Sequence, residues 1–247
     1  MSSNPNQSAT AYHYDSSAAG VRATRRSASV IVPMLLELAR PASVVDVGCG
    51  LGDWLAEFRR LGCSQVLGLD GAWVPREHLQ IPLADFRVQE LGTPLPTFGK
   101  FDLATSFEVA EHVIESAGTE LVRFLTDTAN LVAFSAAVPG QGGYMHVNER
   151  WQSHWITKFA ARGYSAYDVI RPRIWANENC CWWYRQNLLL FATDAEAARL
   201  NLQKQPFFAD AVHPRLYEWH MNPANWSGRT MARMFASKLL PRLRPAN

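Results

Sequence analysis

Short apolar segments alternate with segments of helical periodicity along most of the chain. Runs rich in β-branched and aromatic residues predict strands at residues 43–47, 65–69, 86–88, 101–107, 131–136, 164–170 and 187–192. Between them, apolar residues recur three and four positions apart, which predicts helices at residues 30–38, 51–61, 121–125, 151–162 and 194–203. Strands that alternate with helices form a mostly parallel sheet covered on both faces. We therefore predict an α/β fold.

Three closely spaced glycines follow the first predicted strand. The apolar run at residues 43–47 leads directly into Gly48, Gly50 and Gly52, and a helix comes next. Glycines let the backbone turn sharply and approach a ligand where a Cβ atom would collide. A dinucleotide fingerprint would require glycine or alanine at position 53, where this chain has Asp53. We therefore exclude a nicotinamide-dependent oxidoreductase.

A second element points to a nucleoside. The next predicted strand ends in Asp70, about twenty residues after the glycines, where a carboxylate can accept both hydroxyls of a ribose. Together with Asp46 and the run at residues 101–113, these features resemble class I S-adenosylmethionine-dependent methyltransferases. The resemblance covers roughly residues 40–193 and implies a Rossmann-like fold with a seven-stranded, mostly parallel sheet.

The same resemblance implies S-adenosylmethionine as the cofactor. The resemblance implies that Asp70 binds the ribose and that Glu90, which follows the third strand, meets the adenine amino group. The full set of cofactor-binding residues that it implies is Asp46, Gly48, Cys49, Gly50, Gly52, Asp70, Gly71, Glu90, Leu91, Phe107 and Glu108.

The pattern Glu108-x-x-Glu111-His112 follows the fourth predicted strand. The cofactor carries a sulfonium that is already a strong electrophile, so the protein must mainly align the acceptor, exclude water and accept a proton. Histidine is the side chain best suited to proton transfer near neutral pH. We predict catalytic roles for His112, Glu111 and His146, the last of which follows the fifth strand.

Two carboxylates and two imidazoles can also hold a divalent ion. One helical turn would bring Glu108, Glu111 and His112 together, and His146 would add a second imidazole. This pattern resembles metal-dependent small-RNA 2′-O-methyltransferases and certain ubiquinone-pathway O-methyltransferases. It also resembles many metal-free methyltransferases, in which the first acid meets the cofactor. We expect no metal, and we keep these four residues as the alternative metal site.

Four residues are candidates for contact with the methyl acceptor: Tyr14, His146, Trp183 and Asn187. The first lies in an N-terminal segment that closes over the site in similar proteins. His146 follows a glycine-rich stretch suited to a flap, and the other two precede the last strand. Taken singly, residues of these types are more often packing residues than ligand contacts.

The two ends of the chain differ from its middle. We predict a flexible N-terminal segment or lid at residues 1–22, a methyltransferase domain at residues 23–193 and a C-terminal helical extension with a basic tail at residues 194–247. From Met221 onward there are basic residues and no acidic one, which is most often a solvated basic helix or a frayed tail.

Composition adds limits to this picture. Hydrophobic residues make up 48% of the chain and charged residues 19%, which favours a packed core, and the net charge of +2 is too mild to indicate a nucleic-acid partner. The four cysteines form no CxxC pair, which indicates reduced thiols. The polar start lacks the features of a signal peptide. We expect a cytoplasmic protein without a membrane segment, and we leave a homodimer open.

The expected function is methyl transfer to an oxygen or nitrogen atom of a small molecule. Residues 140–187 resemble a group of bacterial methyltransferases associated with natural-product or surface-glycan pathways. One alternative is a metal-dependent RNA 2′-O-methyltransferase, against which stands the lack of any RNA-binding motif. Another is a non-catalytic S-adenosylmethionine-binding protein, against which stands the intact cluster of acids and histidines.

Overall fold

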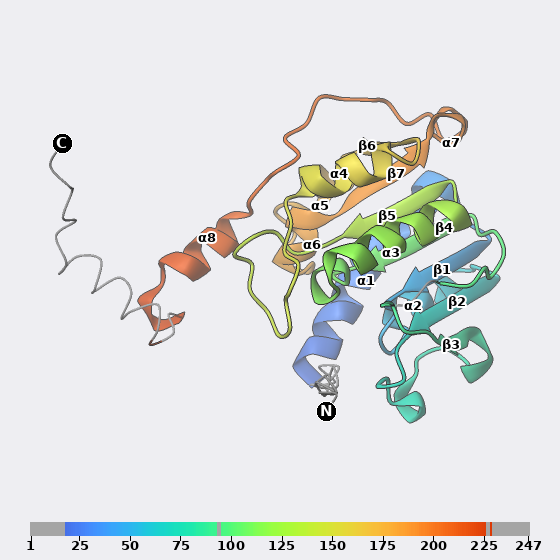
Figure 1. Ribbon diagram of the computed structural model, residues 1–247, viewed down its shortest axis with the longest axis horizontal. Coiled ribbons are helices and arrows are strands. Elements are labelled where there is room, and N and C mark those ends of the chain that lie inside the picture. Colours follow the sequence, from blue (N-terminus) through green and yellow to red (C-terminus); the bar gives the residue numbers. More distant parts are fainter. Residues whose placement is uncertain (1–17, 93–94, 226–227, 229–247) are drawn as a thin grey trace, which may run out of the picture. The chain divides into compact units, whose positions relative to one another are not determined.

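Seven strands form one sheet in the computed structural model, which describes residues 18–92, 95–225 and 228 (Figure 1). Their order across the sheet is β3-β2-β1-β4-β5-β7-β6, and only β7 runs antiparallel to its neighbours. The strands are β1 (Ser43–Val47), β2 (Gln65–Asp70), β3 (Phe86–Val88), β4 (Leu103–Phe107), β5 (Leu131–Ser135), β6 (Tyr164–Tyr167) and β7 (Leu189–Thr193). The predicted fold, a Rossmann-like, seven-stranded and mostly parallel sheet, is confirmed.

Helices cover both faces of this sheet. They are α1 (Ala18–Ala39), α2 (Asp53–Arg60), α3 (Glu115–Thr128), α4 (Gln152–Ala160), α5 (Arg171–Ile174), α6 (Trp182–Asn187), α7 (Asp194–Arg199) and α8 (Pro214–Met221). One hydrophobic core joins the sheet to α1, α2, α5 and α6, and a second core joins its other face to α3 and α4 (Figure 1).

Successive residues of β1 point to opposite faces of the sheet, so this strand contributes side chains to both cores. Val44 packs into the core under α1 and α2, whereas Val45 and Val47 pack into the core under α3. This two-residue period is that of a strand buried on both faces. Because β1, β2, β3 and β4 are parallel, their carboxyl ends meet at one edge of the sheet, where ligands of such folds bind.

Three helical features differ from the sequence predictions. Helix α1 begins at Ala18, inside the segment expected to be a flexible lid, because its residues 28, 31, 32 and 35 form a buried stripe that fixes the helix on α2. Residues 1–17 lie outside the described part of the chain. Helices α5 and α6 were not predicted, since four and six residues are too few for a periodic pattern to be recognised.

By their contacts, residues 1–211 and residues 212–247 form two separate compact units. Helix α7 belongs to the first unit, because Thr193 caps its N-terminus and Ala197 packs into the core. The second unit contains α8, in which Leu216 is buried and Pro214 occupies the first turn. Among the described helices, none combines the length and apolarity that a bilayer-spanning segment requires.

Candidate functional site

The glycine loop after β1 has a conformation that only glycine adopts without strain. Gly48, Gly50 and Gly52 have φ angles of 79°, 54° and 80°, in the left-handed region. A Cβ atom on Gly48 would lie 2.3 Å from a methyl group of Val109. The loop is therefore shaped both by its own backbone and by the segment that follows β4.

Asp70 ends β2 and fastens this loop. One carboxylate oxygen accepts the backbone N–H of Gly50 at 2.7 Å, and the other accepts the N–H of Gly71 at 2.7 Å. Burial raises the pKa of this carboxyl, and hydrogen bonds from these two N–H groups and from the Trp73 side chain oppose that rise. Each carboxylate oxygen has a second lone pair, so Asp70 can still accept hydrogen bonds from a ligand hydroxyl.

Asp46, in the middle of β1, has one oxygen that lacks a partner. Its Oδ1 accepts the hydroxyl of Thr105 at 2.7 Å, whereas Oδ2 makes no hydrogen bond to any described residue. The side chain is 1% exposed and lines the pocket described below. Burial raises its pKa to about 7, the Thr105 hydrogen bond lowers it, and the charge of Asp70 adds to the rise. A buried acceptor oxygen without a hydrogen-bond partner suits a ligand that supplies a hydrogen-bond donor at this position.

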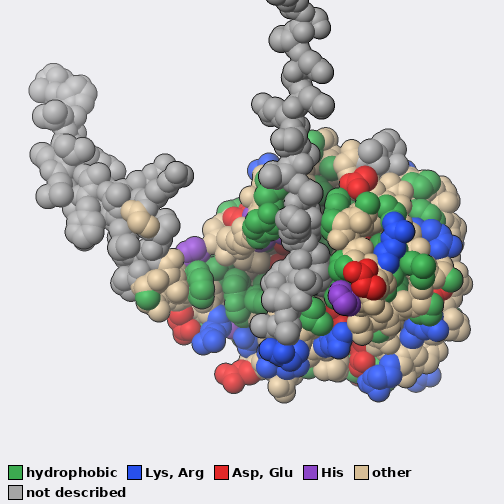
Figure 2. Space-filling view, turned by 90° about the horizontal axis from the view of Figure 1, so that it is seen from below, with side chains coloured by type: hydrophobic (Ala, Val, Ile, Leu, Met, Phe, Trp, Pro, Cys, Tyr) green, Lys and Arg blue, Asp and Glu red, His purple; other side chains and the backbone are tan. Residues whose placement is uncertain are grey.

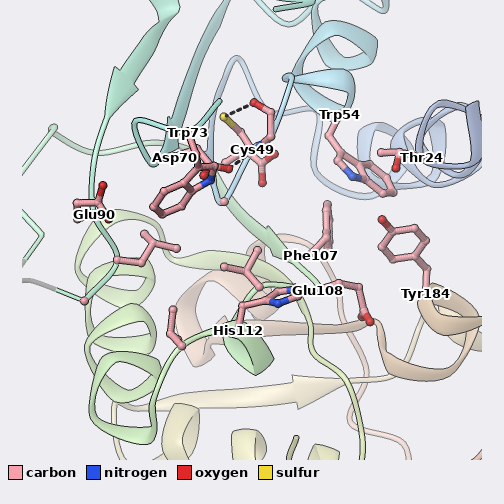
Figure 3. A pocket seen from close by; sticks show the side chains of 17 residues that line it. Thr24, Cys49, Trp54, Asp70, Trp73, Glu90, Phe107, Glu108, His112 and Tyr184 are labelled. Atoms are coloured by element: carbon pink, nitrogen blue, oxygen red, sulfur yellow. Dashed lines mark hydrogen bonds between the residues drawn. The ribbon is translucent and has the colours of Figure 1, made fainter. Parts of the chain in front are cut away.

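A cavity of about 340 Å³ joins these groups at the carboxyl edge of the sheet, within the usual range for small-molecule sites of about 300–1,000 Å³ (Figure 3). Of the predicted cofactor residues, those that line it are Asp46, Gly48, Cys49, Gly50, Asp70, Glu90, Leu91, Phe107 and Glu108. Gly52 and Gly71 do not line it: the first precedes α2, and the second donates to Asp70. Of the predicted catalytic residues, His112 lines the cavity.

Glu108 follows β4 in the left-handed conformation, with φ of 55°. Its carboxylate accepts hydrogen bonds from Gln141 at 2.8 Å and from Asn187 at 3.1 and 3.2 Å. The prediction that one helical turn gathers Glu108 with Glu111 and His112 is therefore wrong. The left-handed residue turns the chain, and a short 3-10 helix begins only at Ala110.

Glu111, His112 and His146 come together behind the cavity. One ligand atom from each lies within 4.8 Å of the others, and the two imidazole rings are 4.9 Å apart at 85°. Glu111 is fully buried, and neither of its oxygens makes a hydrogen bond of good geometry. Its pKa is raised well above the usual range, first by burial and then by the charge of Glu108. Burial, followed by the charge of His146, lowers the pKa of His112 to about 4.

The glycine-rich segment after β5 is tightly turned around Glu149. This carboxylate accepts the backbone N–H groups of Gly140 and Gly142, each at 2.7 Å, and lies 2.9 Å from Nδ1 of His146. A Cβ atom on Gly143 would lie 2.3 Å from the His146 ring, so the ring packs directly on that glycine. Glu149 therefore fixes both the loop and the orientation of His146.

The predicted acceptor residues are placed differently from one another. Asn187 is buried and reaches Glu108, and His146 reaches His112, but neither lines the cavity. Trp183 is partly buried beside Tyr184, and it is Tyr184 that lines the cavity. Tyr14 lies outside the described residues.

Sequence reasoning missed several lining residues: Thr24, Trp54, Trp73, Gly92, Val109 and Val113. One signal was available for Trp54. It stands in the first turn of the helix that follows the glycine loop, and that turn necessarily faces the loop. Tyr184 belongs to the aromatic run before the last strand, which the sequence indicates as part of a pocket wall, and α6 places it at the cavity.

Comparisons with known proteins agree with this geometry. A family model described as a methyltransferase domain matches residues 21–189. The ubiquinone biosynthesis O-methyltransferase of Rhodopseudomonas palustris (strain BisB18) is 32% identical over 120 residues, which cover 44% of this chain and 41% of that protein. The chain thus matches less than half the length of that relative.

Two solved structures share the fold. DesVI of Streptomyces venezuelae has a TM-score of 0.54 at 12% identity, with 70% of this chain and 92% of that chain covered. The magnesium protoporphyrin IX methyltransferase of Synechocystis PCC 6803, solved with bound SAH, has a TM-score of 0.52 at 15% identity, with 70% and 84% covered. Since the family model spans well over half of the chain, the chain belongs to the class I S-adenosylmethionine-dependent methyltransferases.

Proposed function

We propose that this chain transfers a methyl group from S-adenosylmethionine to an oxygen or nitrogen atom of a small molecule, such as a natural product or glycan precursor. One observation carries the proposal: a single cavity joins Asp70 and Glu90, at the ends of β2 and β3, to Glu108 and His112, after β4 (Figure 3). Nucleoside-binding groups and proton-accepting groups therefore face the same space.

The residues fit the cofactor at each of its parts. The free lone pairs of Asp70 suit the ribose hydroxyls, and Glu90 suits the adenine amino group. The orphaned Oδ2 of Asp46 suits the ammonium of the amino-acid end. When bound, the cofactor supplies an electrophilic methyl group on its sulfonium, and the chain has only to orient the acceptor and handle its proton.

His112 is the residue that we assign to the acceptor. Burial and the neighbouring His146 lower its pKa to about 4, so the imidazole is neutral at physiological pH and can accept a hydrogen bond that orients an acceptor hydroxyl. Oxygen is favoured over nitrogen as the acceptor atom by the similarity to an O-methyltransferase over 120 residues.

A metal-assisted variant of the same reaction is a second candidate. Buried Glu111, with both oxygens short of hydrogen bonds, lies beside two imidazoles, and such a donor set suits a divalent ion. A metal held there would supply Lewis-acid activation of an acceptor hydroxyl. The effect of a chelator on activity distinguishes this metal-assisted reaction from the metal-free one.

An RNA acceptor has less support. On the face of the molecule shown in Figure 2, Lys and Arg side chains are interspersed with Asp and Glu, and they form no continuous basic field. Filter binding to a short RNA at two salt concentrations would reveal a salt-dependent affinity if RNA were the acceptor.

The test is methyl transfer from labelled S-adenosylmethionine to a panel of phenols, sugar alcohols and amines, with product identified by mass spectrometry. His112→Ala is expected to lower turnover by about 10²-fold or more with nearly unchanged cofactor affinity. His154→Ala is the matched control, since His154 faces Glu115 outside the cavity. If a chelator abolishes activity and a divalent ion restores it, the metal variant holds. Tight cofactor binding with no transfer to any acceptor would favour a non-catalytic protein.

A further inference from the structure

The cavity is strongly acidic on its inner surface. Among the described residues that line it there are four carboxylates, from Asp46, Asp70, Glu90 and Glu108, and neither lysine nor arginine. Burial raises the pKa of Asp46, Asp70 and Glu108, which means that the empty cavity disfavours the ionised form of each carboxyl. A ligand that carries positive charge relieves this cost, whereas a neutral ligand does not.

Three aromatic rings enclose one end of this cavity. The ring of Trp54, from α2, lies 4.5 Å from that of Phe107 and 5.2 Å from that of Tyr184, and the last two are 6.3 Å apart. Figure 3 shows Trp54 and Tyr184 at this end with Glu108 nearby, while Glu90 and Trp73 lie at the opposite end. The rings come from α2, β4 and α6, three elements that are distant in sequence.

The proposed cofactor placement puts positive charge at the aromatic end. If Asp70 and Glu90 take the ribose and adenine, the amino-acid end, which carries the sulfonium, extends toward Trp54 and Tyr184. Aromatic faces attract cations, with about 0.5–1 kcal/mol at exposed sites and about 2 kcal/mol when water is excluded. The demethylated product lacks the methyl group and has a neutral thioether in place of the sulfonium.

We propose that Trp54, Phe107 and Tyr184 form an aromatic cage that prefers the cationic cofactor over its neutral product. This inference rests on the proposed function. The cage makes Trp54 and Tyr184 specificity-determining residues that favour loading of S-adenosylmethionine and release of S-adenosylhomocysteine after transfer.

Calorimetry with three ligands tests the cage: S-adenosylmethionine, S-adenosylhomocysteine, and sinefungin, in which an amine-bearing carbon replaces the sulfonium. Trp54→Leu removes the aromatic face but keeps an apolar side chain. It is expected to weaken the binding of both cationic ligands by about 2- to 30-fold, from 0.5–2 kcal/mol, and to leave the binding of S-adenosylhomocysteine nearly unchanged. Trp54→Phe, which retains a ring, is expected to restore most of the preference.

Trp73→Leu is the matched control, because this tryptophan lines the other end of the cavity. It is expected to change the affinities for all three ligands by the same factor. If Trp54→Leu fails to fold, Phe107→Leu answers the same question. Equal weakening of all three ligands by a folded cage variant would overturn the proposal and leave Trp54 as a packing residue. Wild-type chain that binds none of the three would instead refute the proposed function.

Discussion

Asp46 gives the proposed cofactor site a measurable proton linkage. Its folded-state pKa is about 7, against an ordinary value of 3.8, so the empty protein carries a proton on Asp46 through the acidic range. A bound ammonium beside Oδ2 would return this pKa toward its ordinary value. Cofactor binding is therefore expected to release about 0.9 proton at pH 6 and about half a proton at pH 7. Affinity should rise by about 50-fold between pH 5 and pH 7.

The coupling is large enough to measure. A change of about three pKa units corresponds to about 4 kcal/mol, which is an upper bound for the contribution of the Asp46 charge to cofactor affinity. Calorimetry at pH 6 in two buffers of different ionisation enthalpy reports the number of protons released. At this pH the cofactor amine is already protonated, since α-amino groups have a pKa of about 7.7–8.0, so its own titration adds little.

Asp46→Asn is the variant that tests whether Asp46 is the source of the released proton. The amide keeps the shape and the contact with Thr105 but cannot ionise, so proton release should fall by the share that Asp46 contributes, and affinity should fall. The same variant also tests stability. Because the folded pKa is raised, the contribution of Asp46 to stability is present at low pH and is lost as the pH rises through about 7. Asp46→Asn should therefore raise the melting temperature of the empty protein at pH 8. Equal proton release from wild type and variant would show that another group is responsible.

Three further predictions follow from the same geometry. Asp70→Ala should weaken cofactor binding by about 10- to 150-fold, from 1.5–3 kcal/mol for charge-assisted hydrogen bonds. Asp102→Ala is the control, because it also removes a carboxylate that accepts backbone N–H groups, but at the opposite edge of the sheet. This control should lower only stability. Gly48→Ala should destabilise the fold by about 1–3 kcal/mol more than Gly62→Ala in urea unfolding. Both glycines have positive φ, but only a Cβ atom on Gly48 would clash with Val109. Equal losses of unfolding free energy in the two variants would show that the clash is not the cause. Glu149→Gln should speed amide exchange across residues 140–146, since one glycine N–H loses its acceptor, and unchanged exchange would refute the role of Glu149.

Much of the fold could be predicted because its determinants are local. The strand, the glycines and the helix at residues 43–60 follow from residue types within a short window, and Asp70 follows from the length of one crossover. The position of Glu108 could not be predicted in this way. Its left-handed backbone depends on contacts with Ser135, Gln141 and Asn187, which are 27 to 79 residues away. At the aromatic end of the cavity, Phe107 was predicted as a cofactor residue, but the packing of Trp54 and Tyr184 beside it depends on the tertiary fold.

The hydrogen bonds from Gln141 and Asn187 to Glu108 couple the cofactor cavity to the segment after β5. Gln141 belongs to the turned segment that also carries His146, while Glu108 faces the cofactor cavity. Positive charge in that cavity favours the ionised form of Glu108, and an ionised carboxylate holds the two amide donors more strongly. Loading the cofactor therefore tightens the segment that borders the acceptor. By thermodynamic reciprocity, an acceptor that orders this segment raises cofactor affinity by the same factor. We therefore expect cofactor and acceptor to bind cooperatively, each raising the affinity for the other.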